Sequence, residues 1–410
     1  MLFFVPSSYL GGKKAMRKLA IFFLAATLAA CTRDLLFPGV PRYQIDNPRP
    51  PGDSSGAAAI PPGGHVWLTA VRFPDGFAWE EDTCAVDGPV WIDLYCDGKV
   101  VSSVPAGECV HPDMHRFAEG HLYADYSTAG ETIILRDGRE LFRFPGRETL
   151  VGFLLRDENV HTLGQDRDGQ GFTYRIDGVQ AYRSETGNIV GAADRDALTG
   201  AEDAVYYCVK VPTEGTQEYR VMRGGETWRT LSDEGYGNTF DIRYAHGSVY
   251  RIRSRPRRLV LEADGGEFTL PLQGGEATLW GRLYAREGDA LALVRATGPA
   301  GRRSFLFSAR DGALPLESGA VVTQVLSDGD RTGWILAGED GDPARFRWNG
   351  GGELAIGPGV YLTSGRCALV REGHLLLALT GRSGTPNRFQ RDGEVTEIPF
   401  NGYFTSITVE

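Results

Sequence analysis

The sequence predicts an all-β protein, an eight-bladed β-propeller that spans residues 65–410. Three observations support this prediction. Short apolar and aromatic runs recur along the chain, tight-turn dipeptides separate them at regular intervals, and no amphipathic helix is evident after residue 30. Four short strands in a repeat of about 40–45 residues are the sequence pattern of a propeller blade.

The turns that mark the repeat are Asp-Gly or Asn-Gly pairs, with one Gly-Gly pair in the same series. Such pairs adopt positive φ easily and close two-residue β-hairpins. Successive turns are 38 to 47 residues apart, and eight of them predict eight blades. They are Asp97-Gly98, Asp137-Gly138, Asp177-Gly178, Gly224-Gly225, Asp264-Gly265, Asp311-Gly312, Asn349-Gly350 and Asp392-Gly393.

A short strand is expected on each side of every turn, as in residues 90–96 and 99–104. Upstream of each pair lie two further strand-like runs, as in residues 149–155 and 160–165. β-Branched and aromatic residues are enriched in these runs, and glycine in the connections. The 346 residues from His65 to Glu410 provide about 43 for each of eight repeats.

The two ends of this region predict how the ring closes. The first repeat has only three clear strands, residues 65–73, 90–96 and 99–104, whereas residues 403–409 form an extra strand after the eighth repeat. Pairing of that last strand with the first repeat would complete the blade and remove an exposed sheet edge. A seven-bladed ring with one degenerate repeat is the alternative.

Residues 1–30 are expected to be a targeting segment. Arg17 and Lys18 precede a twelve-residue apolar run, and Leu28-Ala29-Ala30 leads into Cys31. The run is too short to span a bilayer, which takes about 20 residues. This segment resembles a bacterial lipoprotein signal, which implies that Cys31 is acylated and becomes the new N-terminus. An ordinary secretory signal is the alternative.

Residues 31–64 are predicted to form a tether, because seven prolines and several small residues give them little hydrophobic periodicity. Loss of residues 1–30 removes four basic side chains, so the net charge falls from −10 to −14. A surface this acidic repels phosphate and argues against nucleic-acid binding. We expect a monomer whose link to the membrane is its lipid.

The lipobox, the tether and the strand repeats resemble the propeller lipoproteins of gut Bacteroidota. Segments 113–116, 121–127 and 162–165 strengthen this resemblance. It implies a place in the cell envelope, by default at the outer membrane, on its periplasmic or its outer face. It implies no catalytic residue, and the repeat motifs of better-known propellers are absent from the sequence.

No metal or cofactor is expected. His111, His115 and His121 cluster in the sequence with Asp113, but His-Pro blocks a helix that would align them, so we favour a structural role. The acidic stretch 166–171 resembles the start of a calcium loop but lacks its final carboxylate, and a polar turn explains it. After Cys31, five cysteines remain without zinc-site spacing; one bridge within residues 84–109 is an option.

Two groups of residues are candidate ligand contacts. Trp79 lies in an irregular, acidic stretch, where an exposed indole could act as an apolar platform for a sugar. Arg251, Arg253 and Arg255 alternate along a predicted strand, so they should share one face and could hold a carboxylate, sulfate or phosphate. In the structural alternative for Trp79, its side chain simply packs against neighbouring residues. In the alternative for the arginines, they form a solvated face whose charge is balanced by nearby acidic residues.

These observations favour a membrane-anchored binding or scaffold propeller that captures a glycan or a protein partner. No catalytic motif is present in the sequence, so we favour a binding function over an enzymatic one. A polysaccharide lyase or hydrolase with its site at the channel mouth is one alternative, and a structural component of an envelope complex is another.

Overall fold

In the computed structural model of this chain, the described residues run from 64 to 410. They exclude the segments 80–88, 106–115, 128–130, 146–147, 168–170, 192–196, 202, 214–215, 234–237, 265, 273–276, 287, 300, 317–320, 330, 338–343 and 383. Every described residue belongs to the unit Asp53–Glu410. The expected signal segment, Cys31, His111 and His115 therefore lie outside the described residues. Among those described, no helix has the length and apolar character needed to cross a membrane.

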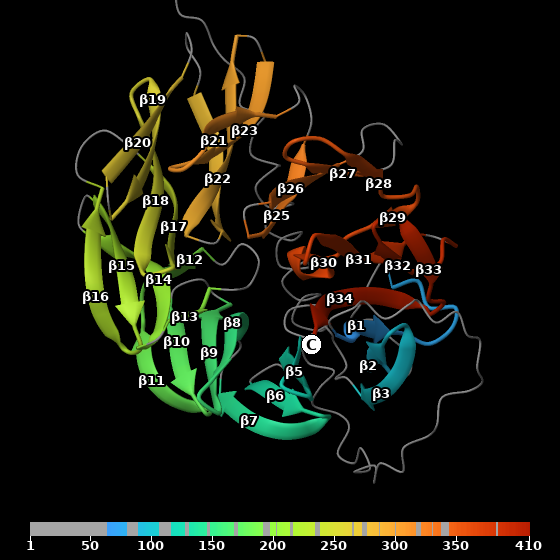
Figure 1. Cartoon of the computed structure of the whole chain (residues 1–410). Coiled ribbons are helices and arrows are strands. Elements are labelled where there is room, and N and C mark those ends of the chain that lie inside the picture. The colour runs from blue at the N-terminus through green and yellow to red at the C-terminus, as the bar shows by residue number, and fades with distance from the viewer. Residues whose placement is uncertain are drawn as a thin grey trace, which may run out of the picture. The chain divides into compact units, whose positions relative to one another are not determined.

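The described strands form eight antiparallel sheets, one for each predicted blade (Figure 1). The prediction of an eight-bladed β-propeller is confirmed, and the seven-bladed alternative is wrong. We number the blades in chain order and list the strands of each from the innermost to the outermost. The one helix among the described residues is the short 3-10 helix η2 (Gly365–Cys367) in blade 8.

The first four blades contain the following strands. Blade 1 has β34 (Gly402–Val409), β1 (Val66–Arg72), β2 (Trp91–Cys96) and β3 (Lys99–Pro105); blade 2 has β4 (Arg116–Ala118), β5 (His121–Ser127), β6 (Glu131–Arg136) and β7 (Arg139–Pro145). Blade 3 has β8 (Glu148–Arg156), β9 (Asn159–Asp166), β10 (Phe172–Ile176) and β11 (Val179–Ser184); blade 4 has β12 (Asn188–Val190) and β13 (Thr199–Gly200), both paired with β14 (Val205–Thr213), then β15 (Thr216–Arg223) and β16 (Glu226–Ser232).

The other four blades repeat this order. Blade 5 has β17 (Thr239–Ala245), β18 (Ser248–Arg255), β19 (Arg258–Ala263) and β20 (Gly266–Pro271); blade 6 has β21 (Ala277–Arg286), β22 (Asp289–Gly298), β23 (Gly301–Ser308) and β24 (Gly312–Pro315). Blade 7 has β25 (Val322–Asp328), β26 (Arg331–Leu336), β27 (Arg345–Trp348) and β28 (Glu353–Ala355); blade 8 has β29 (Val360–Tyr361) and β30 (Ala368–Arg371), both paired with β31 (His374–Gly381), then β32 (Arg388–Arg391) and β33 (Glu394–Glu397).

The eight predicted turn dipeptides mark the connection between the third and fourth strands of their blades. Asp137 and Gly138 show why this dipeptide was a reliable marker, because both have positive φ, 52° and 74°. These are the values of the hairpin turn whose twist matches the strands it joins. The turns between the first and second strands lie at the same end of the blades, which we name the turn face. The opposite end is the loop face.

The last strand completes blade 1, as predicted. β34 pairs with β1 along its length, and the sheet order is β3-β2-β1-β34 (Figure 1). At the centre of this pairing the Thr69 hydroxyl lies 2.6 Å from those of both Thr405 and Ser406, and all three side chains are buried. A buried polar contact of this kind is satisfied only when the two strands meet in one register.

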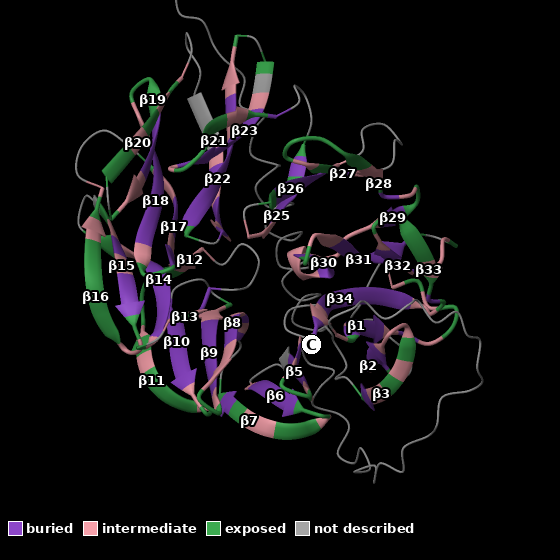
Figure 2. Ribbon diagram, in the orientation of Figure 1, coloured by how far each residue is buried: buried purple, intermediate pink, exposed green. Residues whose placement is uncertain are grey.

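The apolar core lies in the seams between neighbouring blades rather than inside single sheets. Eight clusters of buried side chains each join two adjacent blades, and the cluster that includes Leu68, Leu376 and Phe404 joins blade 8 to blade 1. Burial therefore decreases outward: the second strands are largely buried, whereas outer strands such as β16 are exposed (Figure 2). Hydrophobic burial around the closed ring stabilises the fold.

Three cysteines lie among the described residues, and all are free thiols. Cys208 of β14 and Cys367 of η2 are each buried in a seam between blades. Cys96 is unbridged, so it takes no part in a local disulfide. Cys84 and Cys109 lie outside the described residues, and a bridge between them stays a prediction.

Candidate functional site

Trp79 lies on the loop face in the connection that follows β1. Its ring centre is 5.2 Å from that of Tyr403 and 6.4 Å from that of Phe73, so the indole packs onto the end of blade 1. The side chain is half-buried, and it belongs to a small apolar cluster there. The structure thus gives Trp79 a packing role, with part of its ring still open to solvent.

The arginine row of β18 lies on one face, as the alternation predicts, but carboxylates from the same chain hold it. Arg251 Nε donates to Glu262 at 2.6 Å, and Arg253 Nε lies 3.0 Å from the same carboxylate. Arg255 reaches Glu267 at 2.7 Å. Burial lowers the pKa of Arg253, while Glu262 opposes that shift. The acid-balanced arrangement that we considered for this row is therefore present.

Trp79 and the arginine row do not form a common site. Trp79 lies in blade 1, whereas Arg251, Arg253 and Arg255 lie in blade 5, and no cluster or bond connects them among the described residues. Each would have to act alone. Their use in ligand binding stays a prediction, and other parts of the propeller carry stronger candidates.

A repeated clamp lies on the turn face. In blade 2, one carboxylate oxygen of Asp137 accepts the backbone N–H of Leu122 at 2.9 Å, and the other lies 2.6 Å from His121 Nδ1. Blade 8 repeats this arrangement with His374 and Asp392 at 2.5 Å. The clamp ties the outer turn of a blade to the start of its second strand.

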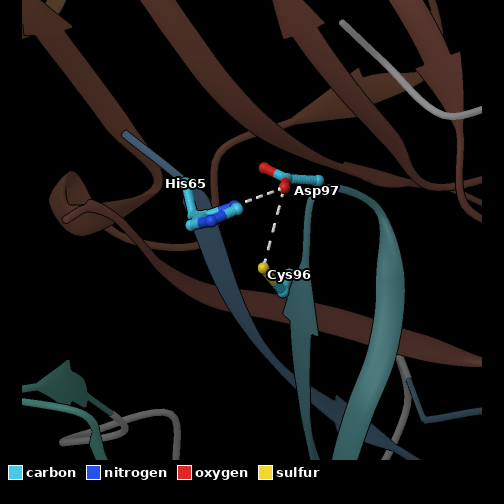
Figure 3. Close-up of side chains that lie close together, drawn as sticks. All are labelled: His65, Cys96 and Asp97. Atoms are coloured by element: carbon cyan, nitrogen blue, oxygen red, sulfur yellow. Dashed lines mark hydrogen bonds and ion pairs between the residues drawn. The ribbon is translucent and has the colours of Figure 1, made fainter. Parts of the chain in front are cut away.

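Blade 1 carries the same clamp with one addition. His65 Nδ1 lies 2.7 Å from Asp97 Oδ2, and the amide of Val66 donates to Asp97 Oδ1 at 2.9 Å. The thiol of Cys96 points toward the same carboxylate, with Sγ 3.7 Å from Oδ2 (Figure 3). Burial and the neighbouring carboxylate both raise the pKa of Cys96. These clamps share a sequence signal, Gly-His before a strand and Asp-Gly after the next one, that could have predicted them.

An aromatic patch with one exposed member lies on the turn face at the seam between blades 4 and 5. We define it as Tyr206, Trp228 and Tyr244. The two tyrosine rings stack at 3.8 Å with 13° between their planes, and Trp228 meets both nearly at right angles, at 5.5 and 5.8 Å. Both tyrosines are buried, whereas Trp228 is 43% exposed. The patch is therefore a rigid base with one open indole.

A β-bulge places Trp228 in this position. The outermost strands of blades 1 to 4 each have one extra residue opposite the third strand, and in β16 that residue is Trp228. The corresponding residue is Val101 in β3, Leu141 in β7 and Ala181 in β11. A bulge turns a side chain away from regular alternation, so the spacing of residues alone could not place Trp228 on a particular face.

Charged groups border the aromatic patch. Tyr206 donates its hydroxyl hydrogen to the Asp203 carboxylate at 3.2 Å, and Arg223 pairs with the same carboxylate at 2.7 Å. Burial, and then the hydroxyl of Tyr206, raises the pKa of Tyr244 to about 12. Tyr244 is thus a neutral group at physiological pH. An indole surface beside a carboxylate and a guanidinium offers both stacking and polar contacts.

A second candidate group lies toward the loop face. Asp125 of β5 is buried, and its Oδ1 has no hydrogen-bond partner among the described residues. Burial raises its pKa to about 7, although the charges of Arg366 and Arg167 oppose the shift. Burial and the charge of Arg366 lower the pKa of Arg116 to about 9. We name Arg116, Asp125 and Arg366 the inner charge group.

The inner charge group combines residues from blades 2 and 8, which are far apart in the sequence. A carboxyl group with a pKa near neutrality can both take and release a proton at physiological pH. A buried oxygen without a partner is rare in folded proteins and calls for a specific explanation, such as a water, an ion or a ligand. Sequence reasoning did not find this group, because no local pattern marks it.

Comparison with known proteins gives the fold and no family. No protein-family model matches the chain, and no curated protein matches it. The solved structure of the dihydro-heme d1 dehydrogenase NirN in complex with DHE is similar at 12% identity, with a TM-score of 0.50, over 83% of this chain and 74% of that one. The β-propeller domain of the Trilobed protease from Pyrococcus furiosus matches at 9% identity, with a TM-score of 0.41, over 68% of this chain and 90% of that one. At such low identity, the likeness shows a β-propeller and carries no activity to this chain.

Proposed function

We propose that this chain is a binding propeller that captures a glycan on its aromatic patch. The observation that carries the proposal is the exposed indole of Trp228, which two stacked tyrosines support and the Asp203–Arg223 ion pair borders. Sugars present apolar C–H faces flanked by hydroxyls, and such a surface provides a partner for each. Because Tyr206 and Tyr244 are already packed, little side-chain entropy is lost on binding.

A glycan array followed by affinity electrophoresis tests this proposal. We expect at least one polysaccharide to bind, and Trp228→Ala to weaken that binding at least about tenfold, as truncation of an anchoring aromatic does. Val101→Ala is the matched control, because Val101 is the exposed bulge residue of blade 1. Equal binding by wild type and Trp228→Ala would overturn the assignment of the patch. Complete lack of glycan binding, with co-purification of an outer-membrane complex, would favour a structural role instead.

The proposal includes an anchor in the bacterial cell envelope. Only the sequence supports this anchor, through the apolar run, the small residues before Cys31 and the proline-rich segment that follows Cys31. Cys31→Ala should move the protein from the membrane fraction to the soluble periplasmic fraction. Protease treatment of intact cells then distinguishes the two faces of the outer membrane. Protection of the propeller would exclude the capture of extracellular polysaccharide.

A second candidate function is a polysaccharide lyase or hydrolase, and the inner charge group is the observation that favours it. In this function Asp125 would transfer a proton, while Arg116 and Arg366 would bind an acidic sugar. Product analysis with the polysaccharides that bind decides between the two functions. Turnover that Asp125→Asn abolishes would support the enzyme. Binding without turnover would leave the binding propeller.

A further inference from the structure

The clamp of blade 1 contains the donor set of a metal site. Atoms of His65, Cys96 and Asp97 that can bind a metal lie within 4.8 Å of one another (Figure 3). Imidazole, thiolate and carboxylate together suit a borderline-soft ion such as Zn²⁺. We propose that these three residues bind one divalent transition-metal ion at the turn face of blade 1, independently of glycan binding.

Comparison with the clamps of blades 2 and 8 shows that a clamp does not need a cysteine. The residue before the clamp aspartate is Arg136 in blade 2 and Arg391 in blade 8, so both clamps form without a thiol. The ties within a clamp run only through the aspartate, the histidine and one backbone amide. Cys96 thus adds a third donor that the clamp itself does not need.

The geometry requires only a small movement to accept an ion. Tetrahedral zinc at normal bond lengths separates a nitrogen and an oxygen ligand by about 3.3 Å, whereas His65 Nδ1 and Asp97 Oδ2 are 2.7 Å apart. The His65 side chain is 56% exposed and can move outward. The Val66 amide holds Asp97 Oδ1 at 2.9 Å and keeps the carboxylate in place.

Binding is balanced by the release of one proton. The Cys96 thiol loses its proton to solvent as the metal–sulfur bond forms. The imidazole stays neutral, because its proton moves from Nδ1 to Nε2 as Nδ1 binds the ion. The His65–Asp97 hydrogen bond is lost in this step, and the ion replaces it as the link between the two side chains. Water completes the fourth position.

Titration of the full chain with Co²⁺, followed by competition between Zn²⁺ and a chromophoric chelator, tests the site. We expect a thiolate-to-cobalt charge-transfer band that saturates at one ion per chain. Cys96→Ser should abolish the band, and both Cys96→Ser and His65→Ala should weaken Zn²⁺ binding more than about tenfold. His121→Ala and His374→Ala are matched controls, because each removes a clamp histidine from a blade without the thiol. Both should bind Zn²⁺ like the wild type.

Other donors are controlled in the same experiment. A variant that combines Cys31→Ser, Cys84→Ser and Cys109→Ser removes the thiols that lie outside the described residues, and it should keep the band. Lack of a band in the wild type, or a band that survives Cys96→Ser, would overturn the proposal. Melting curves in chelator report folding. Should His65→Ala unfold, Cys96→Ser still tests the site, because it leaves the clamp bonds intact.

Discussion

The backbone N–H of His65 donates to the carbonyl oxygen of Glu410 at 2.7 Å, and the Glu410 N–H returns a bond to His65 at 3.2 Å. The first strand of the propeller and the last residue of the chain are thus joined directly. From this pair β34 runs antiparallel to β1, and its apolar side chains fill the seam with blade 8. Closure of the ring depends on this one strand.

Deletion of residues 401–410 should prevent soluble folding, because it exposes the edge of β1 and opens the seam between blades 8 and 1. Soluble yield and circular dichroism measure the effect. A circular permutant that places 402–410 before His65 through an Asn-Gly hairpin is the matched control, since it keeps every strand pair. It should fold. A truncated chain that melts like the full chain would contradict this account of closure.

The eight blades and their closure were predictable because their signals are local. An Asp-Gly turn imposes its own φ values, and a missing strand at one end with an extra strand at the other leaves one way to close the ring. The candidate sites were less predictable. The position of the Trp228 side chain depends on a β-bulge. His65 precedes β1 and Asp97 follows β2, so the pairing of these two strands brings them together. The burial of Asp125 results from the closed ring. The alternation predicted that Arg251, Arg253 and Arg255 lie on one strand, as they do in β18, but the contacts of this row with Glu262 and Glu267 became evident only from the strand pairing.

Removal of a clamp aspartate should destabilise the propeller without unfolding it. Asp137→Ala removes the acceptor for His121 and for the Leu122 amide, so we expect a loss of about 1–2 kcal/mol in the free energy of unfolding. Asp137→Asn is the control, because asparagine tolerates the positive φ and keeps one acceptor oxygen. Urea denaturation measures both. Equal losses in the two variants would mean that the backbone bond contributes little.

A buried ion pair links two strands of blade 3. Arg175 donates two hydrogen bonds to Glu148 at 2.6 and 2.7 Å, both side chains are buried, and the guanidinium lies 4.0 Å from the ring centre of Phe144. Arg175→Met removes the guanidinium that donates two hydrogen bonds to the buried Glu148 carboxylate and should destabilise the protein by about 3–5 kcal/mol.

The double variant Glu148→Leu with Arg175→Met should recover most of that loss, because it leaves no buried charge at either position. Thermal and urea unfolding of both variants test the pair. If the double variant were as unstable as Arg175→Met alone, the lost polar contacts rather than the remaining buried charge would explain the effect. In the wild-type protein the Glu148 carboxylate also lies close to Gly164. A Cβ at residue 164 would come 2.0 Å from Glu148 Oε2, so Gly164→Ala should destabilise the site of this ion pair.

Asp125 should make the stability of the propeller fall as pH rises toward neutrality. Its pKa is about 7 in the folded state, against about 3.9 in an unfolded chain. The folded state therefore binds a proton more tightly, and the stabilisation this provides is complete below about pH 4 and lost as pH rises through 7.

Asp125→Asn carries no charge at any pH, so at pH 8 it should be more stable than wild type by on the order of 1–4 kcal/mol. Near pH 4 the two proteins should be equally stable. Asp241, whose pKa burial raises to about 6, contributes in the same direction, so the variant should keep part of the pH dependence. Melting temperatures from pH 4 to 8 measure this difference, and parallel curves for the two proteins would show that Asp125 does not titrate in this range.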